Sequence, residues 1–181
     1  MNENEMVPIE TVSWEQLQQY VYYGDGTWRD IYVLDASRAD WKIWADSVNA
    51  NYRVEFNDGN DDWHNQIDFA VVESYWDSHG QANVLTAHFF VGEIDVSCHF
   101  FRDDEVENDI DPQKIISYEA HQQLMDYLMR LSQALGKEVV LTPENDTPAS
   151  CNPQWPGPWL PLLSVNGDQV RVCPYWLNSS H

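Results

Sequence analysis

The stretch VLTAHFFVGEIDVSCHFF, residues 84–101, decides the fold class. Gly92 and Glu93 suit the two central positions of a tight β-hairpin, because glycine takes the positive φ that such a turn needs. In that register the facing residues on one side of the two strands are all apolar: Val91 with Ile94, Phe89 with Val96, Ala87 with Cys98, and Leu85 with Phe100. A shift by one residue would destroy this separation, so the sequence predicts an antiparallel hairpin with one face in the core and the other half-exposed.

Three helices are expected to pack against the sheet that contains this hairpin. The first begins at an S-x-x-Q capping box formed by Ser13 and Gln16, and serine caps also precede the other two. The longest helix carries an apolar stripe at helical spacing and ends at Gly136, a natural C-terminal stop. The other two caps are Ser37 and Ser117, and the stripe comprises His121, Leu124, Leu128, Leu131 and Leu135.

Further strands are predicted by short apolar or alternating runs at residues 31–34, 52–56, 67–75 and 138–141. A second hairpin is expected around Asn166 and Gly167. If its loop has four residues, Val165 pairs with Val170 and Leu163 with Val172; a two-residue Asn-Gly turn is the alternative.

Strands and helices do not alternate regularly along the chain, which disfavours a doubly wound parallel sheet. The expected fold is therefore α+β, with a mainly antiparallel sheet and about three helices packed on it. We expect one domain over residues 1–181, with a Pro/Trp-rich loop at 146–161 and a C-terminal hairpin around 162–173. Trp155 and Trp159 lie in that loop and offer rings that could stack on sugars or on a protein partner.

Charge is the strongest compositional signal. The chain has 30 Asp and Glu residues against nine Lys and Arg, a formal net charge of -21. Such a chain repels nucleic-acid phosphates and anionic membrane surfaces, and it attracts basic proteins. Solubility alone is the alternative explanation of the charge.

The N-terminal ten residues lack the basic and apolar regions of a signal peptide, and no apolar run is long enough to span a membrane. Three cysteines at irregular spacing do not form a disulfide framework. Together these features predict a cytoplasmic protein.

Two acidic segments are candidate binding sites for a basic partner. Their carboxylates can pair with Lys and Arg, and a solvated connection is the alternative for each. The first comprises Asp103, Asp104, Glu105, Glu107, Asp109 and Asp111, and the second comprises Asp58, Asp61, Asp62 and Trp63. The second begins with the spacing of an EF-hand calcium loop, but it lacks that loop's Gly and its final Glu.

Catalytic signatures are weak. His88, His99 and Asp95 share the polar face of the first hairpin and form a candidate zinc or iron site, with hydrogen-bonded histidines as the alternative. Cys98 alternates into the apolar face, where a thiol is normally inert. No G-x-S-x-G elbow, local Cys/His signature or glycine-rich phosphate loop is present, so we expect no cofactor and favour a non-enzymatic protein over an enzyme.

The stretch LGKEVVLTPEN, residues 135–145, preceded by Met129-Arg130-Leu131, resembles a segment of small bacterial proteins. The acidity and the expected architecture also resemble immunity proteins that neutralise bacterial toxins. This resemblance implies tight binding to a cognate toxin without catalysis, and it carries over no functional residue.

These observations favour a non-enzymatic binding protein of immunity or inhibitor type, which neutralises a basic partner such as a toxin through an acidic surface. Two alternatives stay open. The chain could be a DNA mimic that acts on a DNA-binding protein, or a small metal-dependent enzyme that uses His88, His99 and Asp95.

Overall fold

The computed structural model describes residues 6–60, 62–78, 83–146 and 161–173. Its strands are β1 (Val7–Pro8), β2 (Arg29–Val33), β3 (Arg53–Asn57), β4 (Trp63–His64), β5 (Thr86–Val91), β6 (Ile94–Cys98), β7 (Val106–Ile110), β8 (Val139–Pro143), β9 (Leu163–Asn166) and β10 (Gln169–Val172). Its helices are α1 (Trp14–Tyr20), α2 (Arg38–Asn51), α3 (Phe69–Asp77) and α4 (Tyr118–Leu135), with the short 3₁₀ helices η1 (Ile9–Thr11) and η2 (Pro112–Lys114).

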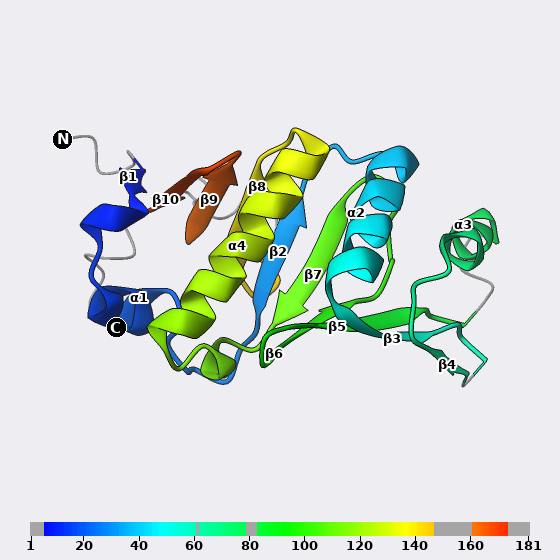
Figure 1. The fold of residues 1–181 in the computed structure, drawn as a ribbon, viewed down its shortest axis with the longest axis horizontal. Coiled ribbons are helices and arrows are strands. Elements are labelled where there is room, and N and C mark those ends of the chain that lie inside the picture. Colours follow the sequence, from blue (N-terminus) through cyan, green and yellow to red (C-terminus); the bar gives the residue numbers. More distant parts are fainter. Residues whose placement is uncertain (1–5, 61, 79–82, 147–160, 174–181) are drawn as a thin grey trace, which may run out of the picture.

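The ten strands form one sheet in the order β1-β10-β9-β8-β2-β7-β6-β5-β3-β4, and the recorded pairings are antiparallel. Helices α2 and α4 lie side by side across one face of this sheet (Figure 1). The α+β class with an antiparallel sheet is confirmed. Among the described residues no helix has both the length and the apolar character needed to cross a membrane.

Both predicted hairpins form in the expected registers. In the first, Val91 pairs with Ile94, and the pairing continues to Ala87 and Cys98 across strands β5 and β6. In the second, Val165 pairs with Val170 and Leu163 with Val172 as predicted. The predicted four-residue loop is wrong, because Asn166 also pairs with Gln169 and only Gly167 and Asp168 lie between the strands. The apolar pairs of both hairpins are buried, as the alternation of their sequences requires.

The predicted helix caps are also present. Ser13 and Ser37 each form a capping box, and Ser117 accepts a hydrogen bond from the backbone of Ala120. Gly136 ends α4 in the left-handed conformation, with φ of 62°. The stripe of α4 that runs from His121 to Leu135 is buried against the sheet.

The strand expected at residues 67–75 is wrong: this segment contains helix α3. The side chain of Asp68 caps the first turn of this helix by accepting a hydrogen bond from the backbone of Ala70. The buried residues Phe69, Val72 and Trp76 follow at helical spacing. The paired valines favoured a strand, but the burial on one helix face outweighs that propensity. The chain thus has four α-helices where about three were expected.

The first acidic segment is no solvated connection, because residues 106–110 form the central strand β7. This strand lies between β2 and β6, and it alternates buried with half-exposed side chains. The second segment contains the short edge strand β4. The Pro/Trp-rich loop falls almost entirely outside the described residues, with Trp155 and Trp159.

Aromatic side chains fill the core between the sheet and the helices. Phe89 of β5 lies with its ring centroid 5.9 Å from that of Trp44 on α2 and 5.3 Å from that of Tyr127 on α4. Two buried hydrogen bonds also link the helices to the sheet. The Trp44 indole of α2 donates to the Tyr127 hydroxyl of α4 (3.2 Å), which donates to Asn108 Oδ1 of β7 (2.6 Å). The three elements therefore share one fixed arrangement.

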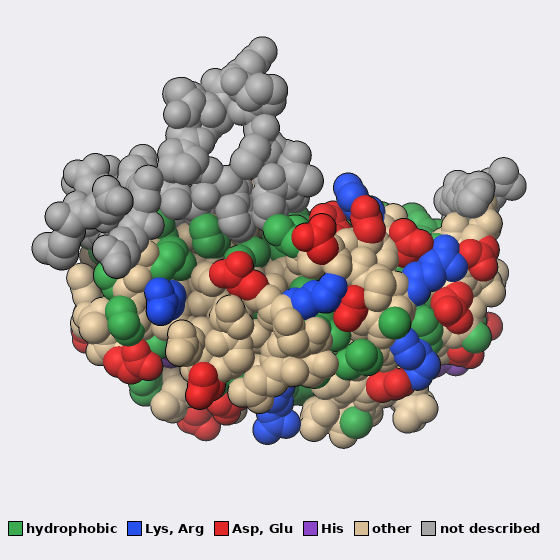
Figure 2. Space-filling model, turned by 90° about the horizontal axis from the view of Figure 1, so that it is seen from above, with side chains coloured by type: hydrophobic (Ala, Val, Ile, Leu, Met, Phe, Trp, Pro, Cys, Tyr) green, Lys and Arg blue, Asp and Glu red, His purple; other side chains and the backbone are tan. Residues whose placement is uncertain are grey.

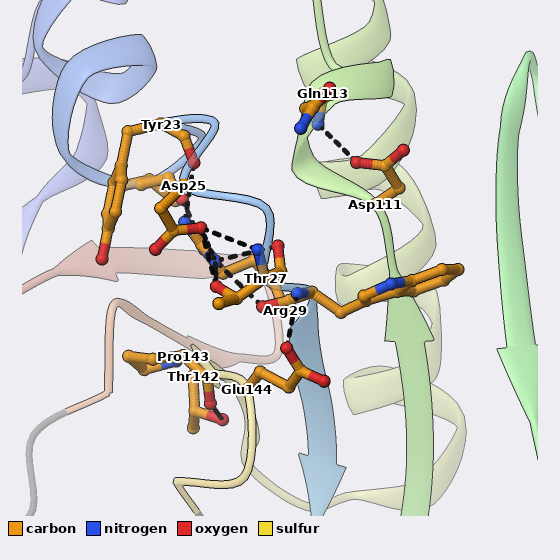
Figure 3. A network of polar contacts seen from close by, with 11 residues as sticks. Tyr23, Asp25, Thr27, Arg29, Asp111, Gln113, Thr142, Pro143 and Glu144 are labelled. Carbon is orange, nitrogen blue, oxygen red and sulfur yellow. Dashed lines mark hydrogen bonds and ion pairs between the residues drawn. The ribbon is translucent and has the colours of Figure 1, made fainter.

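A buried arginine holds the chain between α1 and β2 in place. The side chain of Arg29 is fully buried and donates to four backbone carbonyls, those of Val21 (3.0 Å), Tyr23 (2.9 Å), Thr27 (3.4 Å) and Trp28 (2.9 Å), and to the Thr27 hydroxyl (2.8 Å). It also lies 3.5 Å from Asp25 (Figure 3). The guanidinium thus supplies hydrogen-bond donors to the carbonyls of the whole turn.

Replacing Arg29 with Met is expected to lower the free energy of unfolding by about 1–3 kcal/mol, because it leaves the buried carbonyl of Val21 and its part-buried neighbours without their donors. The matched change Arg130→Met, at an exposed position on α4, should cost less than about 0.5 kcal/mol. Urea denaturation of both variants measures the difference. Equal losses would show that the buried network contributes nothing special.

Candidate functional site

The two faces of the sheet differ in character. On β5 the side chains of Ala87, Phe89 and Val91 are buried beneath the helices, whereas those between them are half-exposed on the opposite face. The half-exposed face runs over strands β7, β6, β5, β3 and β4, and we call it the open half-face. Its side chains are Arg53, Glu55, Asn57, Trp63, Thr86, His88, Phe90, Asp95, Ser97, His99, Glu107 and Asp109, together with Phe101, which stacks on His99.

Strand register sets these side chains in rows across the sheet. One row is formed in full by paired residues of consecutive strands, and it runs Glu55, His88, Ser97, Asp109, Asp30 and Thr142. The row passes from the exposed half into a buried half on β2 and β8, where Asp30, Tyr32 and Val140 are almost inaccessible. Charged and polar side chains thus continue across the boundary between the two halves.

Three carboxylates meet at that boundary. Asp30, Glu107 and Asp109 each place one oxygen within 4.8 Å of the others, and they are the only described residues to form such a group of three. The Tyr32 hydroxyl lies 2.8 Å from Glu107 Oε1 and 3.2 Å from Asp30 Oδ2. The backbone N–H of Asn145 donates to the same Asp30 oxygen (2.8 Å).

The pKa values of Asp30 and Asp109 are both raised. Burial is the main cause for each, and the nearby charge of Glu107 adds to it. The charge of Asp30 is a further cause for Asp109. Because two carboxylates in one place repel each other when both are charged, we expect the pair to share one proton near neutral pH. The Tyr32 hydroxyl can donate its one hydrogen to only one of its two carboxylate neighbours, Asp30 and Glu107.

This group can hold either a proton or a hard cation. A set of carboxylate oxygens suits Mg²⁺, Ca²⁺ or Mn²⁺ by its chemistry, whereas a shared proton would compete with the cation for the oxygens of Asp30 and Asp109. The tyrosine and the backbone donor favour a fixed geometry in both cases. The neighbouring thiol of Cys98 is buried on the helix side of the sheet, and burial raises its pKa.

The two histidines of the predicted metal site lie on the open half-face, but each has its own carboxylate. His88 Nδ1 lies 3.0 Å from Asp95 Oδ1, and His99 Nε2 lies 4.0 Å from Asp109 Oδ2. His99 Nδ1 also lies 3.3 Å from the Thr86 hydroxyl. Burial, followed by the charge of His88, lowers the pKa of His99. This geometry matches the alternative to a metal site, in which the histidines are hydrogen-bonded to neighbouring side chains.

Exposed aromatic rings flank the histidines. The Trp63 ring lies 6.3 Å from that of His88 and is 57% exposed. The Phe101 ring stacks on His99 at 5.4 Å, with an interplanar angle of 23°, and is 60% exposed. Large rings at this exposure, next to carboxylates, are typical of binding surfaces.

The acids of the first predicted segment have different surroundings. Asp103 pairs with Arg38 (2.8 Å), Asp104 and Glu105 pair with Arg102, and Asp111 caps η2. On the edge of the molecule seen in Figure 2, acidic and basic side chains likewise lie side by side. Within the segment, only Glu107 and Asp109 lie on the open half-face.

The second predicted segment is divided between the two sides of the sheet. Trp63 lies on the open half-face, whereas Asp58 lies 3.2 Å from His64 in a groove of about 610 Å³ beside α2 and α3. Asp58 also accepts a hydrogen bond from the backbone of Asn60 (2.9 Å). Asp62 is exposed, and Asp61 lies outside the described residues.

Comparison with known proteins found no related protein. No family model matches the chain, and no curated protein or solved structure matches it either.

Several residues of the site were not predicted from the sequence. Asp30 and Tyr32 lie in an apolar run that gives no sign of a site, and Glu55 lies in a strand read only for its buried partners. One signal was present: Val106, Asn108 and Ile110 alternate with acids, which is the pattern of a half-buried strand.

The raised pKa values of Asp30 and Asp109 predict how the stability of the protein depends on pH. Burial and neighbouring charge raise the pKa of Asp30 to about 6 and that of Asp109 to about 7. The folded state therefore holds a proton that the unfolded chain has lost, so the free energy of unfolding should fall as the pH rises from about 5 to about 8. The slope for one proton is at most about 1.4 kcal/mol per pH unit.

Asp109→Asn should flatten this slope and stabilise the protein at pH 8, because the amide can still donate to Asp30. Asp126→Asn removes the same charge at an exposed position on α4 and should leave the slope unchanged. Thermal or urea denaturation across this pH range measures both. A wild-type stability that stays level, or rises, would rule out the shared proton.

Proposed function

We propose that the chain is a non-enzymatic binding protein of immunity or inhibitor type, which neutralises a basic protein partner on its open half-face. A bacterial toxin is the partner that this class implies. The observation that carries the proposal is the combination of acids that pair with no described Lys or Arg and the exposed rings of Trp63 and Phe101 on one sheet face. The net charge of -21 supports it.

Charge on this face favours a basic occupant. Glu55 is matched by Arg53, but no described basic side chain of the protein pairs with Glu107, Asp95 or Asp109 apart from the histidines. A partner rich in Lys and Arg would supply the missing counter-charges. Its approach would be accelerated by the overall negative field.

The dimensions of the open half-face suit a protein rather than a small ligand. Its outermost strands, β4 and β7, are four strand spacings apart, or about 19 Å. A typical stable interface buries about 800 Å² on each partner, which is a patch roughly 28 Å across. One partner can therefore contact Trp63 at one end and Asp109 at the other.

The DNA-mimic alternative is less well supported by this geometry. A mimic needs carboxylates in a long, unbroken array, like the phosphates that it replaces. The complete row across the sheet instead interrupts its acids with His88, Ser97 and Thr142. The surface therefore looks mixed, as at a protein interface.

The test is affinity capture from native lysate at low salt, with elution by a salt step, followed by binding measurements on the purified partner. The open-face variant carries Asp95→Asn, Glu107→Gln and Asp109→Asn. Its control carries Asp46→Asn, Glu73→Gln and Asp126→Asn, at exposed positions on α2, α3 and α4. Both variants replace three acids with their amides.

We expect a basic partner whose association with the open-face variant slows by about tenfold or more and depends less steeply on salt. The control variant should behave nearly as the native protein does. If the two variants bind equally well, or if the specific partner is not basic, the proposal fails.

The acidic segment itself allows a finer prediction. Asp103→Asn with Asp104→Asn should affect binding much less than Glu107→Gln with Asp109→Asn, because Arg38 and Arg102 already neutralise the first pair. Affinities of the two double variants for the same purified partner measure this. The reverse order would move the binding surface to the loop before β7.

A further inference from the structure

Phe100 adopts a conformation that is unusual for its residue type. Its φ is 54°, in the left-handed region, where a bulky side chain costs roughly 1–3 kcal/mol. The surroundings hold it there: its ring packs 5.4 Å from Trp41, and its carbonyl accepts a hydrogen bond from the Trp76 indole (2.7 Å). A strained residue fixed from both sides calls for an explanation.

The left-handed backbone at Phe100 directs the rings of two consecutive phenylalanines to different environments. Phe100 is 1% exposed in the core, whereas Phe101 is 60% exposed and stacks on His99. The left-handed residue at the end of β6 thus keeps one ring inside while the next remains on the open half-face. The exposed Phe101 ring is therefore held in place by its stacking contact with His99.

Two other aromatic rings of the protein show which kind of group stacks on a ring beside an acid. On the same face, the guanidinium of Arg53 lies 3.5 Å from the Phe90 ring centroid and pairs with Glu55. Arg38 repeats this arrangement 5.5 Å from the Trp76 ring, with Asp77 as its carboxylate. Arginine over a ring beside an acid is therefore a recurrent unit of this structure.

Phe101 has the ring and the acids of this unit, but not the arginine. It lines a small cavity together with Glu105, Glu107 and Asp109. Its neighbour Arg102 lines the same cavity, but its guanidinium pairs with Asp104 through two hydrogen bonds of 2.8 Å and with Glu105 at 3.4 Å. Among the described residues, cations lie over Tyr23, Trp76 and Phe90, and none lies over Phe101.

We propose that Phe101 anchors an arginine of the basic partner, which stacks on the ring and pairs with Glu107 or Asp109. This inference rests on the proposed function and specifies its chemistry. Arginine suits the position better than lysine, because its planar guanidinium can stack and still form paired hydrogen bonds with a carboxylate.

The experiment uses two probes, a peptide of alternating Gly and Arg and one of alternating Gly and Lys, with equal length and charge. Each is titrated into the full chain at low salt by calorimetry, and amide NMR shifts locate the contact. The Arg peptide should bind about two- to fivefold more tightly than the Lys peptide. The largest shifts should fall around His99 and Phe101.

Phe101→Leu keeps an apolar side chain but removes the ring, so it should abolish the preference for Arg while binding of the Lys peptide stays the same. Tyr118→Leu, at a ring that is 54% exposed on α4, should preserve the preference. Melting temperatures of both variants check that the fold is intact.

The outcomes separate this inference from the proposed function. Equal affinity for the two peptides, with both weakened by the open-face acid variant, would overturn the arginine anchor and leave the acidic binding face standing. A preference for Arg that survives Phe101→Leu would also overturn it. If neither peptide binds at low salt, both proposals fail.

Discussion

The alternation of side chains along β7 is the constraint on which the rest of this structure depends. Val106, Asn108 and Ile110 point into the core, and the acids between them point to the opposite face. Because the side-chain period of a strand is two, the same five residues both close the core and display the charge. Asn108 then fixes the helices above through Tyr127 and Trp44.

Negative charge at the centre of a sheet raises an electrostatic problem that the fold answers locally. Asp30 and Asp109 face each other across β2 and β7, where two full charges would repel strongly. The raised pKa values of both aspartates favour a proton on the pair, and the Tyr32 hydroxyl and the backbone N–H of Asn145 also lie against Asp30. Farther from β2, Glu55 and Asp95 lie where water reaches them.

Local patterns were enough to predict much of this fold. The hairpin at Gly92, the three serine caps and the stripe of α4 each depend on neighbours within a few residues. The order of the strands and the partners of Asp30 depend on contacts between residues far apart in the chain, which no local pattern encodes. Helix α3 was missed because its valines favour a strand, and β7 because its acids resemble a loop.

The two independent faces of β7 also bear on how such a protein can diversify. Substitution of Glu107 or Asp109 changes the outer face, while Val106, Asn108 and Ile110 keep their contacts in the core. Under the proposed function, the target could therefore change through a series of substitutions that each leave the core intact. A designer could use the same separation, keeping the inner residues and varying the outer ones as a library for new targets.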